Sequence, residues 1–178
     1  MTVTRPIRNL ALIGFMGTGK SSVGRFVAES LCFTYLDTDL VIETRSHKSI
    51  ADIFRQDGEP SFRELERRIV DELAERTKTV ISTGGGLPTN QANLDSLKTH
   101  SLVVCLWASP ETIYERVREH NHRPLLANED PLKRIRELLS VREPFYRQAD
   151  VLLNTEHRSV REVALQVMHQ FHIAQAAQ

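Results

Sequence analysis

The stretch GFMGTGKS, Gly14 to Ser21, fits the pattern G-x-x-x-x-G-K-[ST] without a mismatch. The apolar run LALIGF (10–15) leads into it and predicts a buried strand, while residues 21–31 predict a helix. In this setting the glycines let successive N–H groups curl into one concavity, and the helix adds the positive end of its dipole. The alternative, a glycine-rich turn without a ligand, lacks a reason for this flanking strand and helix. The sequence therefore predicts a loop that binds nucleotide phosphates.

Within this loop the lysine and the first serine have distinct chemistry. Lys20 is expected to reach the β- and γ-phosphates, and the Ser21 hydroxyl group is expected to bind Mg²⁺. The residues expected to contact the nucleotide are Gly17, Thr18, Gly19, Lys20, Ser21 and Ser22.

Short apolar runs alternate with helical periodicity along the rest of the chain. Further strands are predicted at 33–37, 79–83, 101–107 and 150–154, and helices at 40–45, 50–56, 60–75, 110–120, 132–147 and from 159 onward. This alternation indicates an α/β fold in three layers, α/β/α, with a five-stranded parallel sheet. The 178 residues suit one domain, 1–178, and its ligands are expected beyond the carboxyl ends of the strands.

Composition narrows the class of protein. Lys plus Arg is 23 and Asp plus Glu is 23, so the net charge is zero, which argues against a general nucleic-acid binder. No run approaches ~18 apolar residues and the N-terminal stretch has no signal-peptide pattern, so we expect a cytoplasmic protein without a membrane partner. Cys32 and Cys105 are expected to be buried, reduced thiols.

The phosphate loop alone does not choose among kinases, GTPases and motors. The chain has no [NT]-K-x-D motif for guanine, and no aspartate closes the third or fourth predicted strand. Asp37 and Asp39 follow the second strand instead, and if the strand persists they face the same way. One carboxylate then helps to position Mg²⁺ through water, and the other accepts a hydroxyl proton. A simple turn is the alternative for this segment.

Two more features leave alternatives open at this point. Arg63 and Glu66 lie three residues apart on one predicted helix. Either Glu66 orients the Arg63 guanidinium group so that it can bind a substrate carboxylate, or the two residues form a solvent-exposed ion pair. Gly84, Gly85 and Gly86 follow the third strand, either as a surface that a ligand approaches closely or as a flexible loop.

The ordered set of motifs resembles the shikimate kinase family, in the nucleoside-monophosphate-kinase-like group of P-loop kinases. The resemblance covers nearly the whole chain and rests on GFMGTGKSSVG, LDTD followed by IE, SIADIFRQDGEPSFRELE, STGGG, RPLL and REPFYRQAD. It implies transfer of the γ-phosphoryl group of ATP to the 3-hydroxyl of shikimate, in aromatic amino acid biosynthesis. It also implies Mg²⁺ as cofactor, ATP and shikimate as partners, and a monomer.

The resemblance further implies roles for individual residues. Asp39 is similar to the aspartate that binds shikimate hydroxyls and acts as base, and Asp37 to its companion near Mg²⁺. Arg63 and Arg142 resemble the arginines that hold the shikimate carboxylate, which makes Glu66 the partner that orients Arg63. The remaining substrate residues implied are Gly84, Gly85, Gly86, Phe54 and Phe62.

Two segments follow from the same resemblance, a substrate-binding segment at about 39–66 and a mobile lid at about 119–130. Arg123 resembles the lid arginine that closes over ATP, with a catalytic role beside Lys20 and Asp39, and Arg158 resembles an arginine beside adenine. Two alternatives remain. One is a gluconate-kinase-like enzyme, which has no need for the FRxxE and GGG motifs. The other is a non-catalytic ATP-binding regulator, which usually lacks a lysine or aspartate that this chain retains.

Overall fold

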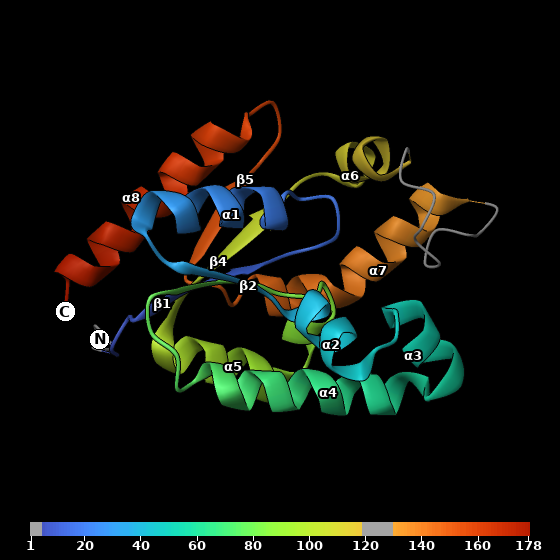
Figure 1. Cartoon of the computed structure of the whole chain (residues 1–178). Coiled ribbons are helices and arrows are strands. Elements are labelled where there is room, and N and C mark those ends of the chain that lie inside the picture. Colours follow the sequence, from blue (N-terminus) through green and yellow to red (C-terminus); the bar gives the residue numbers. More distant parts are fainter. Residues whose placement is uncertain (1–4, 119–129) are drawn as a thin grey trace.

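The computed structural model describes residues 5–118 and 130–178, with the strands and helices arranged as in Figure 1. The strands are β1 (Asn9–Ile13), β2 (Thr34–Asp37), β3 (Thr79–Ser82), β4 (Ser101–Trp107) and β5 (Val151–Asn154). The helices are α1 (Lys20–Leu31), α2 (Thr38–Ser46), α3 (Ile50–Gln56), α4 (Gly58–Leu73), the short 3-10 helix η1 (Leu87–Thr89), α5 (Gln91–His100), α6 (Pro110–Val117), α7 (Pro131–Tyr146) and α8 (Val160–Ala176). None of these described helices is long and apolar enough to span a membrane.

All five strands form one parallel sheet in the order β2-β3-β1-β4-β5. The five predicted strands and the three-layer α/β/α architecture are thereby confirmed. The first strand is shorter than predicted and ends at Ile13, because Gly14 turns the chain away with a φ of 135°. The central strand β1 lies between β3 and β4, so the loop that follows it emerges in the middle of the sheet edge.

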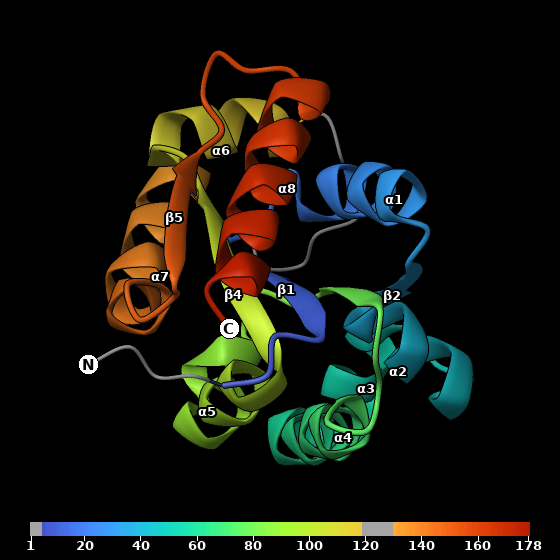
Figure 2. The ribbon, with the colours of Figure 1, turned by 90° about the vertical axis from the view of Figure 1, so that its left-hand side faces the viewer.

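Alternating side chains of β1 supply both faces of the sheet. Leu10 and Leu12 pack into a buried cluster with α1 and α8, while Ala11 and Ile13 pack into a second cluster with α4, α5 and α7. Figures 1 and 2 show the pair α1 and α8 on one side of the sheet and α4 with α5 on the other. Burial on both faces explains why this strand is an uninterrupted apolar run, since each fully buried aliphatic side chain contributes about 1.5–3 kcal/mol.

Helix α5 and the 3-10 helix before it were not predicted from the sequence. Asn90 caps α5 through its side-chain oxygen, which accepts from the Ala92 N–H at 3.0 Å. The helix buries Leu94 and Leu97, which are fully covered. The sequence signal for this helix was an N-cap residue followed by two leucines three residues apart. The polar residues around the leucines made the apolar periodicity weak.

The two cysteines differ in environment. Cys105 is buried in β4 as predicted, and burial raises the pKa of its thiol to about 12. The prediction for Cys32 was wrong, because Cys32 is exposed where it ends α1 in a left-handed conformation with a φ of 55°.

A buried polar cluster ties β1, β3 and β4 together around His100. The Asn9 side chain accepts from the Thr79 N–H at 3.1 Å and donates to the Arg76 carbonyl at 2.7 Å, which fixes its amide orientation. Its N–H group therefore also faces His100 Nδ1, 3.1 Å away, so this ring nitrogen accepts and the ring proton sits on Nε2. Nε2 is buried without a hydrogen-bond partner among the described residues. Burial lowers the pKa of His100, and the charge of Arg8 lowers it further.

This depressed pKa predicts a stability that depends on pH. In the unfolded chain this histidine has a pKa near 6.5 and binds a proton more tightly than the folded protein does. The contribution of the neutral His100 to stability is therefore complete above about pH 6.5 and is lost as the pH falls below it. The expected slope approaches about 1.4 kcal/mol per pH unit from this one group. Urea unfolding between pH 5 and 8 measures it. His100→Asn should flatten the slope, whereas His172→Asn, at an exposed position of α8, should leave it unchanged. An unchanged slope in His100→Asn contradicts the prediction.

Candidate active site

The phosphate loop lies between β1 and α1 and closes on itself. Gly14, Gly17 and Gly19 have positive φ values of 135°, 75° and 93°. The Lys20 ammonium group and the Thr18 hydroxyl group both donate to the Phe15 carbonyl at 2.8 Å. The loop is therefore pre-curled, with the N-terminus of the 12-residue helix α1 at its end, which is the geometry that binds phosphate.

Asp37 connects this loop with the next helix. Its Oδ1 accepts from the N–H groups of Asp39 at 3.1 Å and Leu40 at 3.4 Å, so Asp37 is the N-cap of α2. Its Oδ2 accepts from the hydroxyl groups of Ser21 and Tyr35, each at 3.2 Å. The strand ends at Asp37 as predicted and does not persist to Asp39, because the capping bonds of Asp37 start a helix there.

Asp39 therefore reaches the cavity from the first turn of α2. The preceding residue, Thr38, is fully buried and accepts from the Gly84 N–H at 2.9 Å, which joins α2 to the loop after β3. The Asp39 carboxylate lies directly against Gly84, where any β-carbon would overlap its Oδ1. Glycine at position 84 is thus required by the position of the Asp39 carboxylate.

The other two glycines of this loop each face an arginine. A β-carbon on Gly85 would lie 3.2 Å from Arg142 Nη1, and one on Gly86 would lie 2.6 Å from Arg63 Nη1. The loop is also held by its backbone, because the Tyr146 hydroxyl group donates to the Gly85 carbonyl at 2.7 Å. The triple glycine is a surface that charged side chains approach closely, and its use by a ligand stays a prediction.

Arg63 is held by two carboxylates of α4. It donates to Glu66 Oε2 at 2.7 Å and to Glu59 Oε1 at 2.7 and 3.1 Å. Glu66 is only 1% exposed, so the interpretation as a solvent-exposed pair is wrong. Burial raises the pKa of Glu66 in spite of the lowering effect of Arg63, whereas Glu66 and Glu59 raise the pKa of Arg63 against its own burial.

Arg142 approaches from α7 on the opposite side of the glycine loop. Its guanidinium carbon lies 5.2 Å from the centre of the Phe15 ring, in cation–π geometry. Tyr146, one turn later, is buried beside it, and burial raises the pKa of Tyr146 to about 12, so its hydroxyl group remains a donor.

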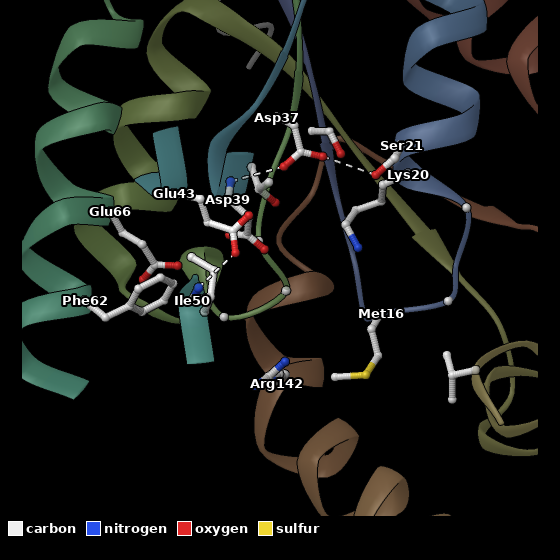
Figure 3. A pocket seen from close by; sticks show the side chains of 18 of the residues that line it. Met16, Lys20, Ser21, Asp37, Asp39, Glu43, Ile50, Phe62, Glu66 and Arg142 are labelled. Carbon is white, nitrogen blue, oxygen red and sulfur yellow. Dashed lines mark hydrogen bonds between the residues drawn. The ribbon is translucent and has the colours of Figure 1, made fainter. Parts of the chain in front are cut away.

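These groups line one cavity of about 670 Å³, part of which is drawn in Figure 3. Asp39 lies between the phosphate-loop residues on one side and Glu66 with Phe62 on the other. The rings of Phe54 and Phe62 pack with centroids 4.8 Å apart and form an apolar wall. The described charged residues of the lining are four acids and four bases, namely Asp37, Asp39, Glu43, Glu66, Lys20, Arg63, Arg116 and Arg142.

Most of the predicted site residues are brought together here. Gly17, Gly19, Ser21 and Ser22 line the cavity, and Thr18 is buried behind the loop. Arg158 is not among the residues of this cavity and lines a separate depression between β5 and α8, where it donates to Gln166. Arg123 and most of the predicted lid lie outside the described residues.

Several residues that line the cavity were not predicted from the sequence. Arg116 of α6 donates to the Gly17 carbonyl at 3.2 Å and to the Thr155 carbonyl at 2.8 Å, which links the phosphate loop to the segment after β5. Glu43 caps α3 by accepting from the Ile50 N–H at 2.9 Å. Glu43 lies one turn after Asp39 on α2, so helical spacing was an available signal, whereas Arg116 had none.

Comparison with known proteins adds an independent result. A protein-family model described as shikimate kinase matches residues 16–172. The chain is 43% identical to the shikimate kinase of Caldanaerobacter subterraneus subsp. tengcongensis, over 93% of this chain and 96% of that protein. It is 44% identical to a shikimate kinase of Thermus thermophilus, over 94% of this chain and 92% of that protein.

Solved structures agree with this result. The structure of Acinetobacter baumannii shikimate kinase in complex with shikimate superposes with a TM-score of 0.88 at 36% identity, covering 93% of each chain. A gluconokinase from Sinorhizobium meliloti reaches a TM-score of 0.64 at 17% identity, with 97% of each chain covered, which shows a shared fold alone.

The raised pKa of Glu66 predicts that its charge reduces stability. Because the folded pKa lies above the unfolded one, stability falls as pH rises through that interval and stays reduced at neutral pH. Glu66→Gln keeps an acceptor for Arg63 without the charge. We expect it to raise the free energy of unfolding at pH 7 by on the order of 1 kcal/mol, with a smaller gain near pH 4.

Glu64→Gln on the same helix is the matched control. Glu64 is exposed, and hydrogen bonds from Arg67 and Arg68 lower its pKa to about 2, so its substitution should shift stability in the opposite direction. Chemical denaturation of both variants at pH 4 and 7 measures the difference. A Glu66→Gln protein that is less stable than the parent at pH 7 would contradict this account.

Proposed function

The chain belongs to the shikimate kinase family, and on this premise we propose that its cavity transfers the γ-phosphoryl group of ATP to the 3-hydroxyl group of shikimate, giving shikimate 3-phosphate and ADP. The observation that carries the proposal is the glycine loop after β3. Its three glycines face Asp39, Arg142 and Arg63 in turn, directly beside the phosphate loop. A hydroxyl-directing carboxylate and two guanidinium groups around one small space match an acceptor that has hydroxyl groups and a carboxylate.

The nucleotide end of the cavity is built by the phosphate loop. Backbone N–H groups of residues 17–20 and the Lys20 ammonium group hold the phosphates and stabilise charge that develops on the transferred group. Arg116 keeps the Gly17 carbonyl in place from outside the loop. Arg123 of the lid and Arg158 on the adenine side remain part of the proposal on the sequence resemblance.

The residues present fit Mg²⁺. Among residues 5–118 and 130–178 there is no group of three or more His, Cys, Asp or Glu side chains suited to a metal. Mg²⁺ does not need one, because it keeps several waters and binds through one or two protein oxygens together with substrate phosphates. The Ser21 hydroxyl group and the Asp37 carboxylate, 3.2 Å apart, supply such oxygens, with Asp37 acting through water. When bound, the ion neutralises charge on the phosphates.

The acceptor end holds the carboxylate of shikimate between two helices. Arg63 comes from α4 with its Nε, Nη1 and Nη2 groups already donating to Glu66 and Glu59, and Arg142 comes from α7. Guanidinium groups that are fixed in this way lose little freedom when they bind. Phe54 and Phe62 form the wall against the ring carbons.

Asp39 directs the acceptor hydroxyl group toward the phosphate. Its position is fixed by the helix cap of Asp37 and by contact with Gly84, so the carboxylate needs no rearrangement to accept a hydrogen bond. Phosphoryl transfer through a loose transition state depends on the alignment of this oxygen more than on early removal of its proton. Asp39 therefore acts mainly by orientation and takes the proton as the new bond forms. The enzyme works as a monomer, with all of these residues in one chain.

The direct test is ADP release with ATP and Mg²⁺ in the presence of shikimate, quinate, gluconate or no acceptor. Release with shikimate alone supports the proposal. Release with gluconate contradicts the roles given to the two arginines, and absence of release while ATP still binds would indicate a non-catalytic regulator.

Asp39→Asn should separate chemistry from binding. We expect kcat to fall about 10²–10⁴-fold, because the amide accepts no proton, while the Kd for ATP stays within about twofold. Steady-state kinetics and calorimetric ATP titration measure the two effects. Asp71→Asn, an exposed position on α4, is the control and should match the parent protein. Normal turnover in Asp39→Asn would remove Asp39 from the mechanism.

A further inference from the structure

We propose that the hydroxyl group of Tyr35 is a positioning group for the metal site, which holds the Asp37 carboxylate in the orientation that serves nucleotide-bound Mg²⁺. The inference rests on the proposed function, since Mg²⁺ belongs to that proposal. It assigns a role to a residue that neither the phosphate loop nor the acceptor site includes.

The period of a β-strand places Tyr35 and Asp37 together. Residues two apart on β2 point to the same face, so the tyrosine lies beside the aspartate that ends the strand. The Tyr35 hydroxyl group donates to Asp37 Oδ2 at 3.2 Å, and the Ser21 hydroxyl group reaches the same oxygen at 3.2 Å. Three elements, β2, α1 and the first turn of α2, thus meet at one carboxylate.

The two oxygens of Asp37 have separate partners. Oδ1 is occupied by N–H groups of Asp39 and Leu40, which cap α2. Oδ2 faces the phosphate loop through Ser21. When Ser21 binds the metal through its oxygen, Tyr35 is the second donor to Oδ2, and it is a donor that does not itself contact the metal. A hydrogen bond at each oxygen fixes the rotation of the carboxylate, and a neutral donor leaves intact the negative charge that metal-bound water requires.

The ring of Tyr35 is itself held by helix α1. A β-carbon on Gly24 would lie 2.8 Å from Tyr35 Cε2, so the ring packs against the helix at a position where only glycine fits. The guanidinium carbon of Arg25 lies 5.4 Å from the ring centre. The same helix begins with Lys20 and Ser21, and the hydroxyl group is therefore fixed relative to the residues that bind the phosphate and the metal.

The experiment compares ADP binding with Mg²⁺ and with EDTA, by isothermal titration calorimetry. In Tyr35→Phe, which keeps the ring, the gain in ADP affinity on adding Mg²⁺ should fall about tenfold relative to the parent protein, the lower end of what loss of a supporting hydrogen bond costs at metal sites. Affinity in EDTA should stay within about twofold. Tyr114→Phe removes the same hydroxyl group from α6 and should change neither value.

A double-mutant cycle with Asp37→Asn shows whether Tyr35 acts through Asp37. The effect of Tyr35→Phe should vanish in the Asp37→Asn background, because no carboxylate is left to orient. A Mg²⁺ dependence in Tyr35→Phe equal to that of the parent overturns the inference. An equal loss in both backgrounds also overturns it.

Thermal unfolding of each variant separates positioning from folding. Tyr35→Met, a second substitution without the hydroxyl group, should lose the Mg²⁺ effect as Tyr35→Phe does; failure of both variants to fold would make the residue structural and overturn the inference. A parent protein whose ADP affinity ignores Mg²⁺, or that releases no ADP with shikimate, would overturn the proposed function itself. The two failures are therefore distinguishable.

Discussion

The close approach of Gly14 to strand β4 is the constraint on which the site depends. A β-carbon at this position would overlap the Leu106 carbonyl, and the φ of 135° is open to glycine alone. The chain can therefore turn directly after the central strand β1, pass close to β4 and begin helix α1 at Lys20. Because β1 has a strand on each side, the loop emerges where the ends of β3 and β4 already lie. The phosphate loop, the acidic end of β2 and the glycine loop after β3 become neighbours as a consequence of the parallel order.

The Asp37 carboxylate then joins the two halves of the cavity. One oxygen starts helix α2 and so places Asp39, while the other meets Ser21 at the start of α1. The residue thus sets the distance between the oxygen proposed to direct the acceptor and the oxygen proposed to hold the metal. A carboxylate suits this position because it accepts on both oxygens, whereas a serine cap would hold the helix and leave Ser21 without a partner.

The sequence predicted the parts of the fold that depend on short, contiguous stretches of residues. All five strands are short apolar runs, and the phosphate loop is one contiguous motif, so both were found from pattern alone. Helix α5 was missed because only two of its buried residues, Leu94 and Leu97, are apolar, and polar residues surround them. The conformation at Asp39 was left open between a continued strand and a turn, because a cap and a strand end look alike until the hydrogen bonds of Asp37 are known. The contact of Arg116 with Gly17 joins residues 99 apart, and no local pattern reports it.

Spacing could pair Arg63 with Glu66, but only burial distinguishes a clamp from a surface ion pair.

The described charged groups of the cavity lining number four acids and four bases, so the lining is formally neutral even though the proposed ligands are anions. The two guanidinium groups nevertheless lie together at the glycine loop, where Arg63 faces Gly86 and Arg142 faces Gly85. The acidic partners of Arg63, Glu66 and Glu59, lie on its own helix. Glu66 is buried behind Arg63, and burial of its carboxylate raises its pKa and lowers the stability of the protein. The hydrogen bond between Arg63 and Glu66 holds the guanidinium group in one orientation before a ligand arrives. Stability given up at Glu66 is thus the physical counterpart of preorganisation in the proposed acceptor site.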